Sequence, residues 1–179
     1  MDEYLSLYKK GEQGEMIASP EKILRGDPVP EGRYALGVAV FVANHRGELM
    51  ATLRAPEKKS WPNYWENSGG GARYGETPVE AIQRELYEET GIRAETEEFI
   101  PLRTFWIDSI REVMTIFILC KDVSLSDVVL QKEETTDVKW CSITEYDRMA
   151  ADGEIAGPIK EKYDQLRDIV VHWVEMWRQ

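Results

Sequence analysis

The stretch from Gly70 to Ile92 decides the fold, and it reads GGARYGETPVEAIQRELYEETGI. Its second part has the marks of a helix that starts near Thr77, whose hydroxyl can cap the first turn. Glu80 completes a capping box with Thr77, and Pro78 suits the first helical turn. Apolar side chains fall on one face of this helix at Val79, Ile82 and Leu86. Gly91 tolerates the left-handed conformation that ends many helices, so the sequence predicts a helix that ends there.

Three carboxylates crowd one side of this predicted helix. On a helix, Glu88 and Glu89 lie close to Glu85, because they follow it by three and four residues. Like charges at i, i+4 destabilise a helix by roughly 0.2–0.5 kcal/mol per pair. Arg84 is the only cation close enough in the sequence to offset them locally. Hard oxygen ligands at close quarters suit Mg²⁺, or Mn²⁺, and such ions commonly hold the phosphates of a substrate. We therefore expect a divalent metal site on this helix.

A run of glycines, Ser68-Gly69-Gly70-Gly71, comes directly before the helix. Glycine lets the backbone approach a ligand closely, so a carbonyl from this loop is a candidate for a further metal ligand. Alone, an acidic pair is usually a solvated helix face, and three glycines are usually a turn. Together they follow the spacing glycine–x5–Glu–x7–Arg-Glu-aliphatic–x–Glu-Glu–x–Gly-aliphatic, which arises by chance on the order of 10⁻⁹ times per starting point.

This spacing matches the Nudix box at every fixed position, so the chain resembles the Nudix hydrolases. The resemblance implies an α/β fold, an α/β/α sandwich with a mixed central sheet. It also implies a Mg²⁺-dependent (or Mn²⁺-dependent) hydrolase that cleaves the diphosphate linkage of a nucleoside diphosphate joined to another moiety, or of a related organic diphosphate. The partner is then a small-molecule diphosphate. The family likeness extends over roughly 34–179, which leaves 1–33 as an N-terminal extension made of a hairpin and a connector.

The resemblance assigns roles to residues by their position in the box. The metal ligands are expected to be the carbonyl of Gly69 and the side chains of Glu85, Glu88 and Glu89. Arg84 and Glu76 resemble the pair that orients the helix carboxylates. Gly70 and Gly91 resemble the turn and cap residues of the motif.

The expected reaction is attack of a metal-activated water on a phosphorus of the diphosphate, assisted by a general base. Family members take this base from the box, here Glu85, or from a later loop, here Glu133 or Glu134. For the substrate phosphates we expect Arg54 and Arg73. Candidates for stacking on a flat group are Trp61, Tyr64 and Trp106, whereas Trp65 and Trp140 are expected in the core.

The flanks of the box resemble a narrower group, the branch related to isopentenyl-diphosphate isomerases. The resemblance lies in Arg54, Lys58, Lys59, Pro62, Trp65 and the segment Gly32-Arg33-Tyr34. The isomerases carry a cysteine in a loop before the box, but this chain has Trp65-Glu66-Asn67-Ser68 there. Hydrolysis is therefore favoured over isomerisation. A non-catalytic nucleotide or ligand sensor is a third alternative, against which the intact box argues.

The remaining sequence predicts strands and helices around this motif. Strands are expected in a hairpin over 4–8 and 15–18, and then over 34–43, 49–53, 98–106, 112–120 and 136–142. A long irregular loop is expected over 55–68. Helices are expected over 143–151 and 158–177, and the second has an apolar seam at Ile159, Tyr163, Leu166, Val170, Trp173 and Trp177. We expect this seam to pack on the chain's own sheet; the alternative is a homodimer interface.

Composition narrows the function further. The chain has 179 residues, 42% of them hydrophobic, and a formal net charge of −11, which suits one domain with a buried core. The acidic balance argues against long nucleic acids and anionic membranes as partners, because these attract basic patches. No apolar stretch approaches the roughly 20 residues that cross a bilayer, and the N-terminus does not resemble a signal peptide. Cys120 and Cys141 form no metal-spaced pair, which favours two plain buried thiols in a cytosolic protein.

Overall fold

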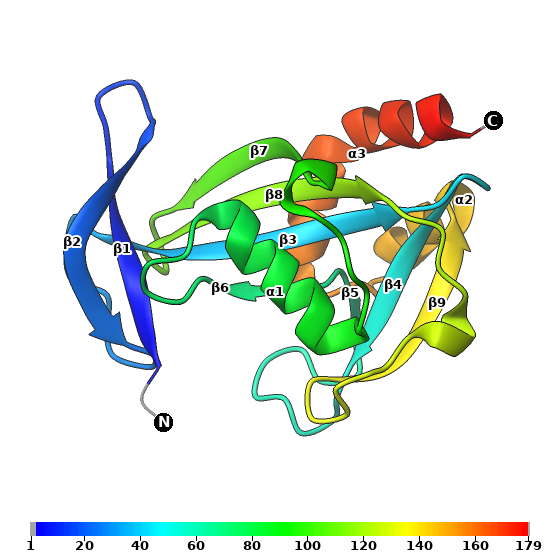
Figure 1. The fold of residues 1–179 in the computed structure, drawn as a ribbon, viewed down its shortest axis with the longest axis horizontal. Helices are drawn as coiled ribbons and strands as arrows, with labels where there is room; N and C mark the ends of the chain where they lie inside the picture. The colour runs from blue at the N-terminus through cyan, green and yellow to red at the C-terminus, as the bar shows by residue number, and fades with distance from the viewer. Residues whose placement is uncertain (1–2, 179) are drawn as a thin grey trace.

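The computed structural model describes residues 3–178, so Met1 and Asp2, which begin the acidic N-terminus, and Gln179 lie outside it. Within this range a mixed sheet is covered by helices on both faces (Figure 1). The helices are α1 (Pro78–Thr90), α2 (Ile143–Ala151) and α3 (Gly157–Trp177). The strands are β1 (Tyr4–Lys10), β2 (Met16–Leu24), β3 (Tyr34–Ala43), β4 (Glu48–Arg54), β5 (Trp65–Glu66), β6 (Gly69–Gly71), β7 (Ile100–Ile107), β8 (Glu112–Cys120) and β9 (Thr135–Ser142).

Strand β3 is the centre of the sheet. It runs parallel to β8 along its whole length, from Ala35 opposite Glu112 to Ala43 opposite Cys120. Its antiparallel neighbours are β1, β4 and the short glycine strand β6. The single parallel pair among antiparallel ones makes the sheet mixed, as predicted.

Side chains of β3 alternate between two cores. Ala39, Phe41 and Ala43 face a core that α2 and α3 cover, whereas Val38 and Val40 face a second core that α1 covers. A strand that is buried on both faces needs apolar residues throughout, and the sequence of β3 supplies them. The predicted α/β/α sandwich is therefore confirmed.

The helix of the deciding stretch forms where the sequence predicts it. Thr77 caps α1, and the capping box with Glu80 is complete on both sides. Gly91 ends the helix in the left-handed conformation, with φ of 72°. Ile82 and Leu86 are fully buried against the sheet, which fixes the rotation of α1 about its axis. With this rotation Glu89 is buried on the same side of the helix, Glu85 is half-buried and Glu88 is exposed.

Two boundaries in the N-terminal half differ from the prediction. Strand β2 extends to Leu24 rather than ending at Ala18, and it passes through Pro20 because an edge strand has one side that needs no ladder hydrogen bonds. The segment predicted as an irregular loop over 55–68 contains the two-residue strand β5, which pairs with the end of β4. So short a strand carries too little periodicity to be seen in the sequence.

The seam of the last helix packs on the chain's own sheet, as expected. Ile159, Tyr163, Leu166 and Val170 are buried, but the next buried position is Val174 rather than Trp173. Trp173 and Trp177 are half-buried at the margin of the same core. A straight helix has 3.6 residues per turn, so a pattern spaced by sevens drifts around it. The homodimer alternative stays a prediction.

Both cysteines are unpaired. Cys141 is buried in the core, whereas Cys120 is only half-buried, and its sulfur lies 3.8 Å from Nε2 of His45. Among the described residues, no helix is both long and apolar enough to cross a membrane.

Candidate active site

The glycines before α1 are required by close packing. A Cβ added to Gly70 would lie 2.5 Å from the carboxyl carbon of Glu85, and one added to Gly69 would collide with the carbonyl oxygen of Val38. Strand β6 therefore fits between β3 and the carboxylate face of α1 only because these residues lack side chains. This packing explains why the glycines stand at a fixed distance before the helix.

Arg84 is the hub of the predicted motif. Its guanidinium donates two hydrogen bonds to Glu76, Nε to Oε1 at 2.6 Å and Nη2 to Oε2 at 2.8 Å. It also donates to Glu85 at 2.8 Å and to the carbonyl of Gly71 at 3.2 Å. Burial disfavours the charge on Arg84, but the bonds to Glu76 and Glu85 outweigh it and raise the pKa of the guanidinium. Arg84 thus ties the loop before α1 to the carboxylates on it.

Glu89 is the most deeply buried carboxylate of the motif. Burial raises its pKa well above the ordinary value, and the nearby charges of Glu66 and Glu85 raise it further. Burial also raises the pKa of Glu85, although hydrogen bonding to Arg84 opposes this. These carboxylates therefore repel one another in a poorly solvated place, where a cation would relieve the repulsion.

Glu66 belongs to this cluster, and sequence reasoning missed it. Its carboxylate accepts bonds of 2.6 and 2.7 Å from one nitrogen of Arg54, and burial raises its pKa. Glu66 lies on β5, before the Nudix box and outside its fixed positions. Its place beside Glu89 depends on how the loop over 55–68 folds back, which no local spacing reveals.

The carboxylates of α1 line a polar cavity of about 400 Å³, here called the carboxylate pocket. The walls that matter for chemistry carry Glu85, Glu88, Glu89, Glu134, Arg73 and Arg84. Glu134 reaches the pocket because the loop before β9 is tied to the end of α1. In that loop Val129 donates a backbone hydrogen bond to Thr90 at 2.9 Å, and Gln131 donates one to Glu89 at 3.2 Å.

Of the two later-loop glutamates, Glu134 lines the carboxylate pocket and Glu133 does not. Glu134 is paired with Lys58, whose side chain also lines the pocket. The structure therefore brings one predicted base candidate, Glu134, to the same cavity as the other, Glu85.

The predicted phosphate ligands both reach this region, with a third arginine that the sequence did not suggest. Arg73 donates to Glu88 at 3.1 Å, and Arg54 is held by Glu66. The third is Arg25, which follows the hairpin and donates to the carbonyl of Gly71 at 3.2 Å. Its position depends on pairing between β1 and β3, so nothing within its own segment of sequence could have found it.

The donor set suits a hard divalent cation, but the side chains are engaged with one another. Within residues 3–178, no three His, Cys, Asp or Glu side chains are already arranged around one point as metal ligands. Arg84 holds Glu85 and Glu88, and Arg73 also holds Glu88. The buried Glu89, the half-buried Glu85 and the exposed Glu88 still form the oxygen-rich surroundings that Mg²⁺ and Mn²⁺ prefer.

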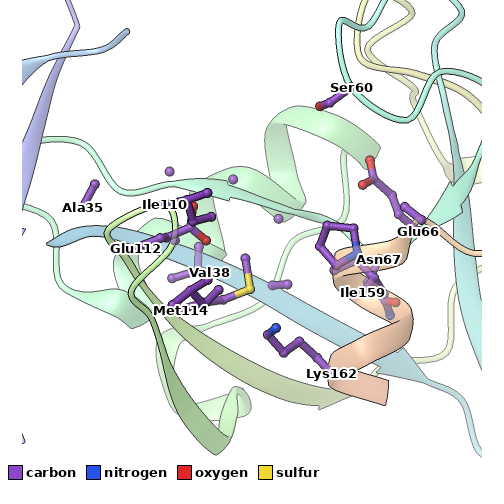
Figure 2. Close-up of a pocket in the computed structure, with 18 of the residues that line it drawn as sticks. Ala35, Val38, Ser60, Glu66, Asn67, Ile110, Glu112, Met114, Ile159 and Lys162 are labelled. Atoms are coloured by element: carbon purple, nitrogen blue, oxygen red, sulfur yellow. The ribbon is translucent and has the colours of Figure 1, made fainter. Parts of the chain in front are cut away.

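A second cavity, of about 410 Å³, lies beyond β6 and is here called the apolar pocket (Figure 2). Its apolar walls come from β3, β8 and α3, including Val38, Met114 and Ile159. Gly69, Gly70, Gly71, Arg25 and Arg54 line both cavities, so the two pockets meet at β6. A ligand with one charged and one less polar part can therefore lie across both.

Of the predicted stacking residues, one lines the apolar pocket. Trp61 has φ of 53° and lies against Gly157 at the start of α3. Tyr64 packs on Trp61 edge to face, with 5.1 Å between ring centroids. The prediction for Trp106 is wrong, because its indole donates to the carbonyl of Gly14 at 2.9 Å and lines neither cavity.

Comparison with known proteins agrees with this arrangement. The NUDIX domain family matches residues 33–162. An uncharacterized Nudix hydrolase of Listeria monocytogenes is 32% identical over 132 residues, which cover 73% of this chain and 77% of the relative. An isopentenyl-diphosphate Delta-isomerase of Corynebacterium diphtheriae is 45% identical, but over only 53 residues and 29% of each chain. Because that match is so short, the isomerase-related branch stays a prediction.

Solved structures show the same fold. A protein from Deinococcus radiodurans has a TM-score of 0.70 and 26% identity, and the match covers 91% of this chain and 98% of that one. A bifunctional NMN adenylyltransferase/ADP ribose pyrophosphatase of Francisella tularensis, complexed with AMP and a manganese ion, has a TM-score of 0.62 and 19% identity. That second match covers 76% of this chain and 42% of the bifunctional protein. With the Nudix box, the sandwich fold and these relatives, the chain belongs to the Nudix hydrolase family.

Proposed function

We propose that this chain hydrolyses the diphosphate linkage of a nucleoside diphosphate joined to another moiety, in a reaction that depends on Mg²⁺ or Mn²⁺. The observation that carries the proposal is that the two cavities lie next to each other and share the lining residues Gly69–Gly71, Arg25 and Arg54. One cavity is crowded with carboxylates, the other is largely apolar, and arginines stand where they meet. A diphosphate joined to a bulky substituent matches this arrangement, because it has a charged part beside a larger and less polar part.

Glu85, Glu88 and Glu89 are the residues proposed to hold the metal, with the carbonyl of Gly69. When bound there, a divalent cation supplies two things: a lower pKa for a water molecule and neutralisation of charge on phosphoryl oxygens. Arg84 keeps Glu85 turned toward the pocket and anchors it to the loop through Glu76. Glu66 adds a further negative charge beside Glu89.

Arg25, Arg54 and Arg73 are proposed to bind the diphosphate oxygens. A planar guanidinium suits phosphate because it can donate two parallel hydrogen bonds. Arg54 is already oriented by Glu66, which reduces the conformational freedom it loses on binding. Since Arg25 follows the hairpin, the N-terminal segment 1–33 is proposed to complete the site rather than merely precede it.

Glu134 is proposed as the general base, with Glu85 as the alternative. Glu85 already accepts a hydrogen bond of 2.8 Å from Arg84. Glu134 faces the same pocket from a loop, and its partner Lys58 is a flexible side chain that can release it. A carboxylate in this position can accept the proton that the attacking water loses.

The test is hydrolysis of a panel of nucleoside diphosphate derivatives, with Mg²⁺, with Mn²⁺ and with a chelator. We expect turnover only with metal, and we expect Glu89→Gln to lower kcat by about 10³-fold, because several kcal/mol of transition-state stabilisation is lost. Glu97→Gln, at an exposed position outside both pockets, is the matched control. Metal-independent turnover, or equal turnover by Glu89→Gln, defeats the proposal.

A further inference from the structure

Two charged side chains lie among the apolar walls of the apolar pocket. Figure 2 shows Glu112, at the start of β8, and Lys162, on α3, facing the cavity with Met114 between them. Lys162 is only 3% exposed, which is rare for lysine, and Glu112 is mostly buried. Neither belongs to the Nudix box, and the proposed reaction gives neither a role.

The backbone around Glu112 makes room for its carboxylate. A Cβ added to Gly37 on β3 would lie 2.8 Å from Oε1 of Glu112. The carboxylate therefore lies directly over Gly37, so a side chain at this position would have to displace it. Burial raises the pKa of Glu112, and the charge of Lys162 opposes this.

Lys162 is held by weak partners. Its ammonium lies 3.3 Å from Glu161, an exposed residue next to it in the chain, and 5.3 Å from the ring centroid of Phe105. Among the described residues, no hydrogen bond or ion pair joins Lys162 to Glu112. An ammonium has three donors and a carboxylate accepts at two oxygens, so both groups keep hydrogen-bonding capacity toward the cavity.

What fills the cavity decides whether this arrangement is favourable. A hydrocarbon group would displace water from both charged side chains without offering them a hydrogen-bond partner. This costs roughly 1–3 kcal/mol or more per unsatisfied group. A group with a hydrogen-bond acceptor beside a donor would satisfy both. The cavity, at about 410 Å³, lies within the roughly 300–1,000 Å³ range of small-molecule sites.

We propose that Lys162 and Glu112 determine substrate specificity: on the base of the nucleoside diphosphate, Lys162 donates to an acceptor and Glu112 accepts from an N–H. The preferred substrate class is therefore a nucleoside diphosphate derivative whose base carries an exocyclic amino group beside a ring nitrogen or carbonyl. Isoprenoid diphosphates, which have no such edge, are rejected. This inference rests on the proposed function, because it places the diphosphate at β6.

The first experiment compares kcat/KM for matched substrates with Mg²⁺. The panel holds adenosine, guanosine and cytidine diphosphate derivatives, each beside its counterpart without the exocyclic amino group, and isopentenyl diphosphate. We expect the best amino-bearing substrate to exceed its counterpart by at least about 10²-fold, because a site built to hydrogen-bond a group rejects the analogue that lacks it. Equal rates for the pair, or preference for isopentenyl diphosphate, overturn the inference.

Variants assign the preference to the two residues. We expect Glu112→Leu to abolish the discrimination within the matched pair, and Glu112→Gln, which keeps an acceptor oxygen, to retain most of it. Lys162→Met is expected to lower kcat/KM for the best substrate by at least about 10-fold, since a donor to the base is lost. Lys160→Met, on the same helix but outside both cavities, is the control. An unchanged ratio in Glu112→Leu, with an unchanged melting temperature, contradicts the assignment.

Binding separates this inference from the proposed function. Calorimetry with non-hydrolysable α,β-methylene diphosphate analogues of the same matched pair measures the preference without turnover. Preferential binding that Glu112→Leu removes supports the specificity site even if no hydrolysis is found. Hydrolysis without any such preference supports the reaction alone and overturns the inference.

Discussion

The carboxylate pocket and the apolar pocket share the wall Gly69–Gly71, but they are assembled in opposite ways. One continuous segment, 69–89, supplies most of the chemistry-bearing walls of the carboxylate pocket. The apolar pocket takes its walls from β3, β8, α3 and the loop that carries Trp61, which lie far apart in the sequence. The residues proposed for the reaction are therefore local in the sequence, whereas those proposed for specificity come together only through tertiary structure.

The two pockets also differ in electrostatics. In the carboxylate pocket, burial raises the pKa values of Glu85 and Glu89, and neighbouring like charges raise them further. In the apolar pocket, burial raises the pKa of Glu112, and the opposite charge of Lys162 opposes this rise. Repulsion favours a site that takes up a cation. Opposite charges held apart favour a site that takes up a neutral polar group.

The largest effect that tests this contrast is expected at Arg84, which belongs to the carboxylate pocket alone. Arg84→Lys keeps one positive charge but loses the two-pronged contact with Glu76 and the bonds to Glu85 and Gly71. We expect kcat to fall by about 10–100-fold, as for other residues that orient metal ligands. KM and the base preference are expected to stay unchanged. Steady-state kinetics on the matched substrates measures all three, and a loss of base preference would show that the pockets are not independent.

A smaller effect is expected at Trp61, which belongs to the apolar pocket alone. We expect Trp61→Ala to raise KM by roughly 10-fold with little change in kcat, because stacking on a base contributes about 1–3 kcal/mol and is made equally in the ground and transition states. Trp61→Phe, which keeps an aromatic face, should recover most of the loss. Met176→Ala, at an exposed apolar residue of α3, is the control. A fall in kcat at unchanged KM would instead place Trp61 in the reaction itself.

The same contrast explains how much the sequence predicted. The capped helix depends on residues within one segment, and their spacing alone predicts it. The ion pair between Arg84 and Glu76 was expected from the resemblance to the Nudix box. The glycines were expected as a loop, whereas they form the strand β6. The burial of β3 on both faces followed from its continuous apolar sequence. Local geometry is what spacing encodes, so these features were accessible without a structure.

The residues that the sequence did not reveal come from distant segments. Arg25 depends on the pairing of the hairpin with β3, and Glu66 on a loop that folds back along β4. Glu112 and Lys162 come together because β8 lies parallel to β3 and α3 packs across the sheet. Trp106 misled the prediction, since its aromatic ring serves packing against Tyr34 rather than a ligand.

The smallest expected effect concerns stability, and it tests whether the carboxylate pocket is electrostatically strained. Burial, with the charges of Glu66 and Glu85, raises the pKa of Glu89 well above 4.5. Between pH 4.5 and the raised pKa of Glu89 in the folded chain, the folded chain keeps a proton that the unfolded chain has lost. Stability therefore falls as pH rises through this window. Glu89→Gln is neutral at every pH and escapes that loss. In chelator at pH 8 we expect its Tm to exceed that of the native protein by a few degrees, roughly 2–4 °C per kcal/mol for a chain of this size.

The pH and metal dependence of this difference identify its cause. The difference in Tm between Glu89→Gln and the wild-type protein should shrink as pH falls through 4.5. Glu89 of the wild-type protein then becomes protonated in the unfolded chain as well as in the folded one. Added Mg²⁺ should also close the gap, since a cation bound by the native carboxylates stabilises the folded chain and Glu89→Gln binds it less well. Thermal unfolding across pH, with and without Mg²⁺, measures both trends. A difference in Tm that does not change with pH would come from packing around residue 89. The repulsion inferred for this pocket would then be wrong.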